Sequence, residues 1–187
     1  MVKHRVLDQQ KVLATAGVMA SESGVANLNF KALATRLDIR SQSLYNYYPN
    51  IEAVIEALGA DFLTQLDTQL THGLVGLSGV DSLQRFAEIS HDYFDSTGNR
   101  VQLLYYIHRY AETSPFVQAL KAVIDLLKQL VAGVHLRQMS QEAYVQGLIS
   151  SVLGFTVLEI MNYLPDEYHD VNYHQMLQLY LNEVQND

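Results

Sequence analysis

The sequence predicts an all-α protein. Its 187 residues include only three prolines, no stretch alternates apolar and polar residues as a β-strand does, and no Asn-Gly or Asp-Gly hairpin signal occurs. Apolar residues instead recur three and four positions apart, most clearly from Ile51 to Leu70. We expect about nine helices, in which a small three-helix N-terminal group is joined by a long fourth helix to a helical bundle.

The expected helices follow from this periodicity and from the residues that stop it. A glycine-rich stretch at 72–79 should end the fourth helix, because three glycines occur within seven residues. Ser41 is expected to cap the third helix, and Asn50, after Pro49, the fourth. The nine helices are then expected at about 5–22, 30–36, 41–47, 50–71, 80–96, 99–112, 115–135, 140–163 and 170–185.

Composition bounds the kind of protein. Hydrophobic residues make up 49% of the chain and charged residues 17%, which favours a globular fold with a sizeable core. The chain has no cysteine and its first residues lack the apolar core of a signal peptide, so we expect a cytoplasmic protein without disulfides. The longest apolar stretch, 145–160, is shorter than a membrane span and contains Gln146 and Glu159. No membrane association is therefore expected.

Charge is distributed unevenly along the chain. Residues 1–50 contain six lysines and arginines against three acids, a net charge of +3, whereas the remaining residues contain six against 17, a net charge of −11. The positive charge of residues 1–50 would attract phosphates, whereas the negative charge of the remainder would repel them.

The segments 30–36 and 41–47 have the spacing of a helix-turn-helix. Two short helices joined by a turn of three or four residues, packed on a preceding helix, place the second short helix in the DNA major groove. Leu44 and Tyr48 are expected to face the supporting helices, which leaves hydroxyl and amide groups on the outer face. By itself the pattern also fits a helical corner of an ordinary bundle.

The amino-acid sequence of this region resembles that of the TetR family of transcription regulators over about residues 8–60. The family pattern is an apolar-Ala pair, a Gly-Val-Ser turn, Leu-Tyr-x-His/Tyr-Phe and a Lys-Glu opening of the fourth helix. The corresponding residues here are Leu33-Ala34, Asp38-Ile39-Arg40, Leu44-Tyr45-Asn46-Tyr47-Tyr48 and Ile51-Glu52. Two of them depart from the pattern. Asp38 replaces the glycine of the turn, and aspartate tolerates the left-handed conformation that this position requires. Ile51 replaces the lysine at the start of the fourth helix, and this change removes one phosphate contact.

The resemblance implies which residues face DNA. Base-edge contacts are expected from Arg40, Ser41, Gln42 and Asn46, and phosphate or base contacts from Ser43, Tyr45 and Tyr47. For Tyr45, partial packing within the head is an equal alternative. Lys31 is a further candidate, and Asn50 with the start of the fourth helix can bind a phosphate oxygen. Lys3, His4 and Arg5 form either a basic arm that reaches DNA or a solvated terminus.

The remainder, residues 50–187, is expected to hold a dimer interface and a ligand pocket, with residues 1–49 as the DNA-binding domain. The helix at 140–163 is apolar nearly all round, and it pairs with the last helix in the family's dimers; packing within one chain is the alternative. The expected interface residues are Gly147, Ser150, Ser151, Gly154, Leu158, His174, Leu177 and Leu181. A pocket for a small apolar or aromatic ligand is expected from residues that can also be plain core: Tyr93, Phe94, Tyr105, Tyr106, His108, Tyr110, Phe116, Phe155 and Met161.

No catalytic or metal-binding pattern is present in the sequence. The seven histidines show no ligand spacing, and neither a glycine-rich phosphate loop nor a nucleophile elbow occurs, so we expect no cofactor and no enzyme. The hypothesis is a homodimeric transcription regulator, most simply a repressor that releases its DNA operator when a ligand binds. The alternative is a helical adaptor or co-regulator that acts through a protein partner.

Overall fold

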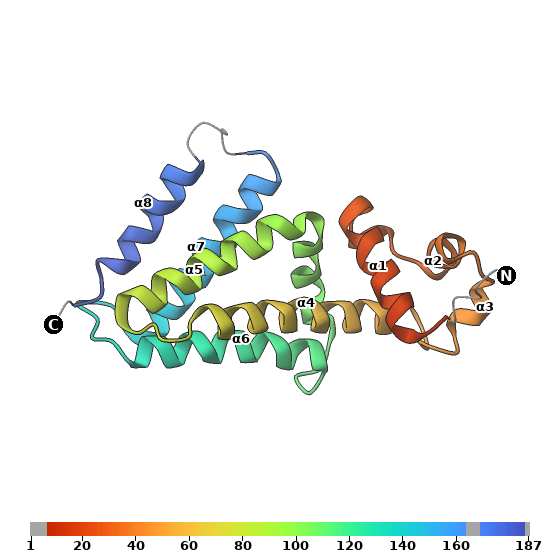
Figure 1. The fold of residues 1–187 in the computed structure, drawn as a ribbon, viewed down its shortest axis with the longest axis horizontal. Helices are drawn as coiled ribbons and strands as arrows, with labels where there is room; N and C mark the ends of the chain where they lie inside the picture. Colours follow the sequence, from red (N-terminus) through yellow and green to blue (C-terminus); the bar gives the residue numbers. More distant parts are fainter. Residues whose placement is uncertain (1–6, 164–168, 186–187) are drawn as a thin grey trace. The chain divides into compact units, whose positions relative to one another are not determined.

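The computed structural model describes residues 7–163 and 169–185, and all regular elements within these ranges are helical. The only β-type pairing there is a single bridge between Leu136 and Val184. This confirms the predicted all-α class (Figure 1). In chain order the elements are α1 (Gln9–Ser23), η1 (Val25–Asn27), α2 (Phe30–Leu37), α3 (Ser41–Leu44), α4 (Ile51–Gly73), α5 (Gly79–Thr97), η2 (Gly98–Arg109), α6 (Pro115–Ala132), α7 (Gln141–Ile160) and α8 (His169–Leu181).

Polar side chains cap the first turn of most of these helices. Asn50 Oδ1 accepts a hydrogen bond from the backbone N–H of Ala53 at 2.8 Å, which confirms its predicted role as the cap of α4. Asp8, Asn29, Ser114 and Ser140 each accept in the same way from the N–H three residues further on. Glycines in positive-φ conformations then break the chain between α4 and α5, as predicted for residues 72–79.

Two helix predictions were wrong in detail. Ser41 is the first residue of α3 rather than its cap; Arg40 occupies the cap position, without a side-chain hydrogen bond. The segment expected as an α-helix at 99–112 is instead the 3-10 helix η2. Its apolar residues Val101, Leu104 and Ile107 recur every three positions. That spacing fits three residues per turn as well as 3.6 over so short a segment, so the pattern cannot separate the two helix types.

The chain packs into two compact units whose boundary lies within α4. The first contains residues 7–62 and 99–118, and in it α1 packs on α2 and α2 on α3. Segment 99–118 joins this unit through the Asn99 amide, which donates to Ser21 O at 3.1 Å, and through the Tyr110 hydroxyl, which donates to Glu52 O at 3.0 Å. Phe116, fully buried, lies against Gly59 of α4, where no larger residue would fit beside its ring.

The second unit contains residues 63–98, 119–163 and 169–185. Here α5 packs against α7 and α8, and α7 packs against α8; Figure 1 shows α5 and α7 side by side. Its core is built from Leu83, Phe86, Leu127, Leu148 and Leu177. The functional division predicted between residues 49 and 50 stays a prediction, since packing groups the first turns of α4 with the N-terminal helices.

Candidate nucleic-acid interface

The turn between α2 and α3 is a Schellman motif. The Ile39 N–H donates to Ala34 O at 3.0 Å and the Asp38 N–H to Thr35 O at 3.2 Å, the two hydrogen bonds that define this helix ending. Asp38 itself adopts φ 55°, ψ 48°, the left-handed helical conformation that glycine usually supplies. The prediction that aspartate sustains this turn is confirmed. The sharp reversal sets α3 at an angle to α2, as a helix-turn-helix requires.

Buried apolar residues hold α3 in place from one side. Leu44 is fully buried and Tyr48 is 4% exposed, which confirms that both face the supporting helices. On α2, Leu33 and Ala34 complete this small core. Backbone hydrogen bonds continue the helical turn after Leu44, because the Tyr48 N–H donates to Leu44 O at 3.0 Å. The face of α3 opposite this core is left to solvent.

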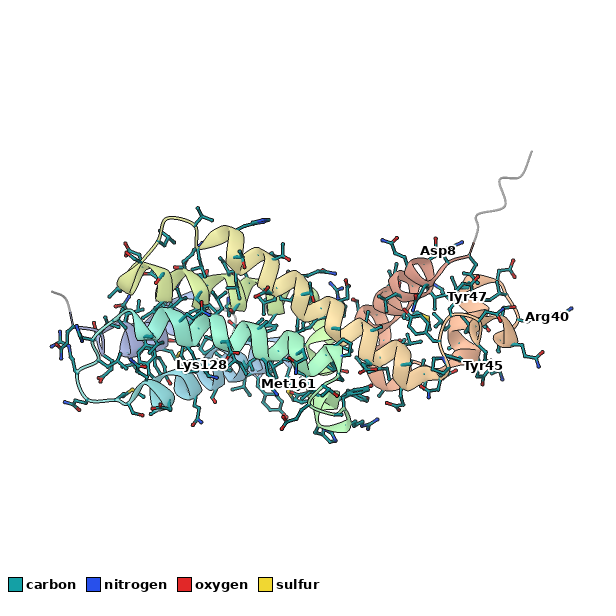
Figure 2. The ribbon with its side chains drawn as sticks, turned by 90° about the horizontal axis from the view of Figure 1, so that it is seen from below. Asp8, Arg40, Tyr45, Tyr47, Lys128 and Met161 are labelled. Atoms are coloured by element: carbon teal, nitrogen blue, oxygen red, sulfur yellow. The ribbon has the colours of Figure 1, made fainter. Side chains whose placement is uncertain are left out.

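The polar residues predicted to read base edges lie on the solvent side. Arg40, Ser41, Gln42 and Asn46 are exposed, Ser43 is half-buried, and Figure 2 shows the Arg40 side chain pointing away from the helices around it. Lys31 and Asn50 are exposed too. A hydroxyl, an amide and a guanidinium together can pair with both the donors and the acceptors that base edges present. Contact of these residues with DNA stays a prediction, and Lys3 and Arg5 lie outside the described residues.

The two tyrosines of the motif have different environments. The Tyr45 ring is 59% exposed and contacts the Phe30 ring edge-on at a centroid distance of 5.0 Å, so it is partly packed and partly available. The Tyr47 hydroxyl donates to Leu7 O at 2.7 Å. Since a tyrosine hydroxyl has one proton, this bond leaves none for a phosphate oxygen, which is an acceptor only. In this structure Tyr47 therefore lacks the donor that the predicted phosphate contact needs.

The aromatic residues predicted to line a ligand pocket fall into two groups, one in each compact unit. The first unit contains Tyr105, Tyr106, His108, Tyr110 and Phe116, and the second contains Tyr93, Phe94, Phe155 and Met161. Tyr93, Phe94 and Phe116 are buried, whereas Tyr105 is 60% and Met161 57% exposed. Burial raises the pKa of Tyr110 well above its usual range, and its hydroxyl bonds with Glu52. These groups supply buried core and exposed surface, and their role as a pocket stays a prediction.

A polar contact inside the second unit was missed by the sequence reasoning. His91 Nε2 lies 2.7 Å from Glu159 Oε2, and the two side chains are only 15% and 8% exposed. The His91 ring stacks on Tyr173 at 4.0 Å, and the Tyr173 hydroxyl donates to Ala87 O at 2.8 Å. The contact joins α5, α7 and α8. A carboxylate near the end of an otherwise apolar helix was the available signal, because a buried charge needs a partner.

A groove of about 640 Å³ between α6 and α7 was also not foreseen. Its lining includes the apolar Ile124, Val145 and Ile149 together with Lys128, which pairs with Asp125 at 2.8 Å. Figure 2 labels Lys128 on α6. The groove is open to solvent and lies on the same helix as the predicted dimer interface.

Part of the predicted dimer interface is occupied within a single chain. Tyr180 of α8 packs against Gly147, where an added Cβ would come within 3.0 Å of the ring, and the Tyr180 hydroxyl lies 2.6 Å from Ser151 Oγ. Leu177 and Leu181 are 1% and 6% exposed. Gly147 and Ser151 thus contact α8 within the protomer, and Leu177 and Leu181 are buried in it, whereas the role of all four in a dimer interface stays a prediction. Ser150, Gly154, Leu158 and His174 remain exposed.

Helix α7 is more apolar than its own burial accounts for. Among the described helices it is the one whose length and composition would allow it to cross a membrane, yet only 28% of that apolar window is buried. One side packs into the core through Tyr144, Leu148 and Val152. The other exposes Leu158 by 42%, followed by Met161. Its contacts with α5 and α8 are those of a core helix, while its other side exposes Ser150, Gly154 and Leu158 next to the half-buried Ile149, Leu153 and Val157.

Comparison with known proteins identifies sequences and solved structures that are similar to this chain. No family model matches the sequence. The chain is 24% identical over 153 residues to the uncharacterised HTH-type transcriptional regulator YobS of Bacillus subtilis, which covers 81% of this chain and 78% of YobS. It is similar in structure to a tetR-family bacterial regulatory protein from Rhodococcus RHA1, with a TM-score of 0.76, 12% identity and coverage of 96% and 97% of the two chains.

A second solved structure extends this comparison. A TetR variant from Acinetobacter baumannii AYE, solved in complex with minocycline, matches with a TM-score of 0.67 and 16% identity over 95% of this chain and 96% of that one. The matches cover both compact units rather than the N-terminal helices alone. The chain therefore has the fold of the TetR-family transcriptional regulators.

Proposed function

We propose that this protein is a homodimeric DNA-binding transcription regulator of the cytoplasm. The observation that carries the proposal is the geometry of α3: a Schellman turn at Asp38 and the buried Leu44 fix the helix, while its polar face is open. An α-helix presented in this way fits the major groove. The residues proposed to contact DNA are Lys31, Arg40, Ser41, Gln42, Ser43, Tyr45, Asn46 and Asn50, with Lys3 and Arg5 from the N-terminal segment.

The uncovered face of α7 supports dimerisation. A soluble monomer rarely leaves a long apolar helix with a contiguous exposed face, because about 25 cal/mol is lost for each Å² of apolar surface in water. Leu158 and Met161 on or next to α7, and Leu179 on α8, are 42–72% exposed. A second copy placed by a two-fold axis would cover the same residues on both chains. Two heads held in this way would read two half-sites of an operator.

A ligand would act through η2. This segment is tied to α1 through Asn99 and to α4 through Tyr110, so a change in η2 reaches both helices that support the DNA-reading unit. A run of twelve 3-10 residues is unusually long, and its hydrogen-bond geometry is poorer than that of an α-helix, so η2 is a segment that a ligand could rearrange at low cost. A small apolar or aromatic ligand that favours one arrangement of η2 would change DNA affinity by a coupling free energy of about 1–3 kcal/mol. The simplest regulator of this kind is a repressor released by its ligand.

The adaptor hypothesis remains as a second candidate because of one position. The first residue of α4 is Ile51, which is half-buried. The TetR family pattern has a lysine at this position. Together with the net charge of −11 over residues 51–187, this weakens the electrostatic part of DNA binding. Retention of a stoichiometric protein partner, without specific binding to DNA, would favour this candidate.

Selection of operators from random DNA, followed by affinity measurements on single-base variants, tests the first proposal. Gln42→Ala should relax the preference at one base position and cost about 1–3 kcal/mol for a lost bidentate contact. Because Gln42 is exposed, the variant should keep the wild-type melting temperature. Gln10→Ala, at an exposed position on α1, is the matched control. The proposal fails if no salt-sensitive DNA binding is found, or if Gln42→Ala leaves every base preference unchanged.

A further inference from the structure

The reading helix, formed by α3 and the turn that continues it to Tyr48, exposes two amide side chains on one face. Leu44 and Tyr48 are buried and lie four positions apart, and the Tyr48 N–H donates to Leu44 O at 3.0 Å, so the helical turn extends past Asn46. Gln42 and Asn46, also four apart, are exposed. Each lies two positions from a buried residue, which turns its side chain by about 200° around the helix axis. The two amides therefore lie opposite the buried side of this helix.

These two amides are not used inside the protein. Elsewhere in the first compact unit, the amides of Asn29 and Asn50 cap helices. Among the amide side chains of this unit that the structure describes, those of Gln42, Asn46 and Gln10 make no hydrogen bond to the protein. An amide that loses its water on binding must regain both a donor and an acceptor, or the complex loses affinity. Any partner of the reading helix must therefore supply both to each amide.

The major-groove edge of one base supplies both groups. A glutamine or asparagine amide carries one donor and one acceptor side by side, whereas a guanidinium carries donors only. Adenine presents its N6 donor next to its N7 acceptor, and guanine presents two acceptors. Cytosine offers a donor alone, and thymine offers an acceptor beside a methyl group. Adenine is thus the base that can satisfy both halves of such an amide.

We propose that Gln42 and Asn46 each read the major-groove edge of an adenine, so that the operator half-site contains two A·T pairs in register with them. The inference rests on the proposed DNA-binding function and deepens it by naming the bases. Four residues of helix rise about 6 Å, and successive base pairs are about 3.4 Å apart. The two A·T pairs are therefore separated by about one or two base-pair steps.

An adenine analogue that lacks one groove acceptor tests this. Operators are selected from random DNA with the wild-type protein, and each preferred adenine is replaced in turn by 7-deazaadenine, which keeps the Watson–Crick pair but has C–H in place of N7. Wild-type affinity should fall by about five- to tenfold at each of the two adenines, because an amide N–H loses its acceptor. Gln42→Ala should be insensitive to the analogue at one adenine and show the wild-type loss at the other. Asn46→Ala should show the reverse.

Gln10→Ala is the matched control, because it removes an exposed amide from α1 rather than from the reading helix, and it should show the wild-type loss at both adenines. All three amides are exposed, so every variant should keep the wild-type melting temperature.

Three results would overturn the inference: selected operators without the two A·T pairs, equal losses in Gln42→Ala and wild type at both adenines, or a wild-type affinity that the analogue leaves unchanged. The last of these would mean that any A·T preference comes from DNA shape. The analogue acts on the wild-type protein, so this arm of the experiment does not depend on how a variant folds. If the wild-type protein shows no salt-sensitive binding to any duplex, the proposed function fails first and the inference fails with it.

Discussion

Replacing Asp38 by alanine, asparagine or glycine separates the two consequences of having aspartate in the helix-turn-helix turn. Asp38 adopts φ 55°, ψ 48°, within a few degrees of the ideal left-handed helix. This conformation costs an ordinary L-residue roughly 1–2 kcal/mol and costs glycine almost nothing. Aspartate and asparagine lie between, because their short polar side chains bond locally to the backbone.

The expected free energies follow from these values. Asp38→Ala should lower the free energy of unfolding by about 1 kcal/mol, since the Schellman hydrogen bonds to Thr35 and Ala34 force alanine into the same strained conformation. Asp38→Gly should change it by less than about 1 kcal/mol, because relief of strain is offset by the greater entropy of the unfolded chain. Asp38→Asn should be nearly neutral, since asparagine is equally tolerated there.

DNA affinity should follow a different order from stability. Asp38 is exposed next to the reading helix, and a unit charge about 10 Å from a phosphate interacts in water by roughly 0.4 kcal/mol before screening. Asp38→Asn and Asp38→Gly should therefore both tighten DNA binding by about twofold at low salt, and less at high salt. Urea unfolding and fluorescence anisotropy on one duplex measure the two quantities. Equal stability of the alanine and wild-type proteins would refute the strained turn, and unchanged affinity of the asparagine variant would refute the electrostatic argument.

Two further predictions concern the second compact unit. Leu158→Asp should convert the proposed dimer to monomer in analytical ultracentrifugation, because it places a charge on the uncovered face of α7. The control Val75→Asp, at a 78% exposed loop position, should leave the mass unchanged. A Leu158→Asp variant that remains dimeric would place the interface elsewhere. Hydrogen bonds from the Met139 and Gln138 N–H groups hold the pKa of Glu183 below its usual range, so its carboxylate stabilises the fold above about pH 5 and that contribution is lost as the pH falls through the depressed pKa. Glu183→Gln should accordingly melt at lower temperature than wild type at pH 7, with the difference narrowing toward pH 3, and a constant difference across this range would contradict the assignment.

Local rules acting within a few residues were sufficient to predict most elements from the sequence. The cap at Asn50, the glycine break after α4 and the apolar stripe of α4 depend on neighbours in the chain, so the residues alone were enough to predict them. The tolerance of the α2–α3 turn for Asp38 is of the same kind. The exposed polar face of α3 followed once Leu44 and Tyr48 were recognised as its buried side.

Tertiary structure decided which surface each side chain faces. Gly147 has the spacing of an interface residue, but only the packing of α8 shows that the Tyr180 ring lies against it within one chain. The family resemblance assigns Tyr47 a phosphate contact, but its hydroxyl donates its proton to the carbonyl of Leu7, forty residues away. The periodicity of a helix reports that a face is buried and not what buries it, because the hydrophobic effect is non-directional. The partner of each face, and of each hydrogen-bonding group on it, is a property of the assembled fold.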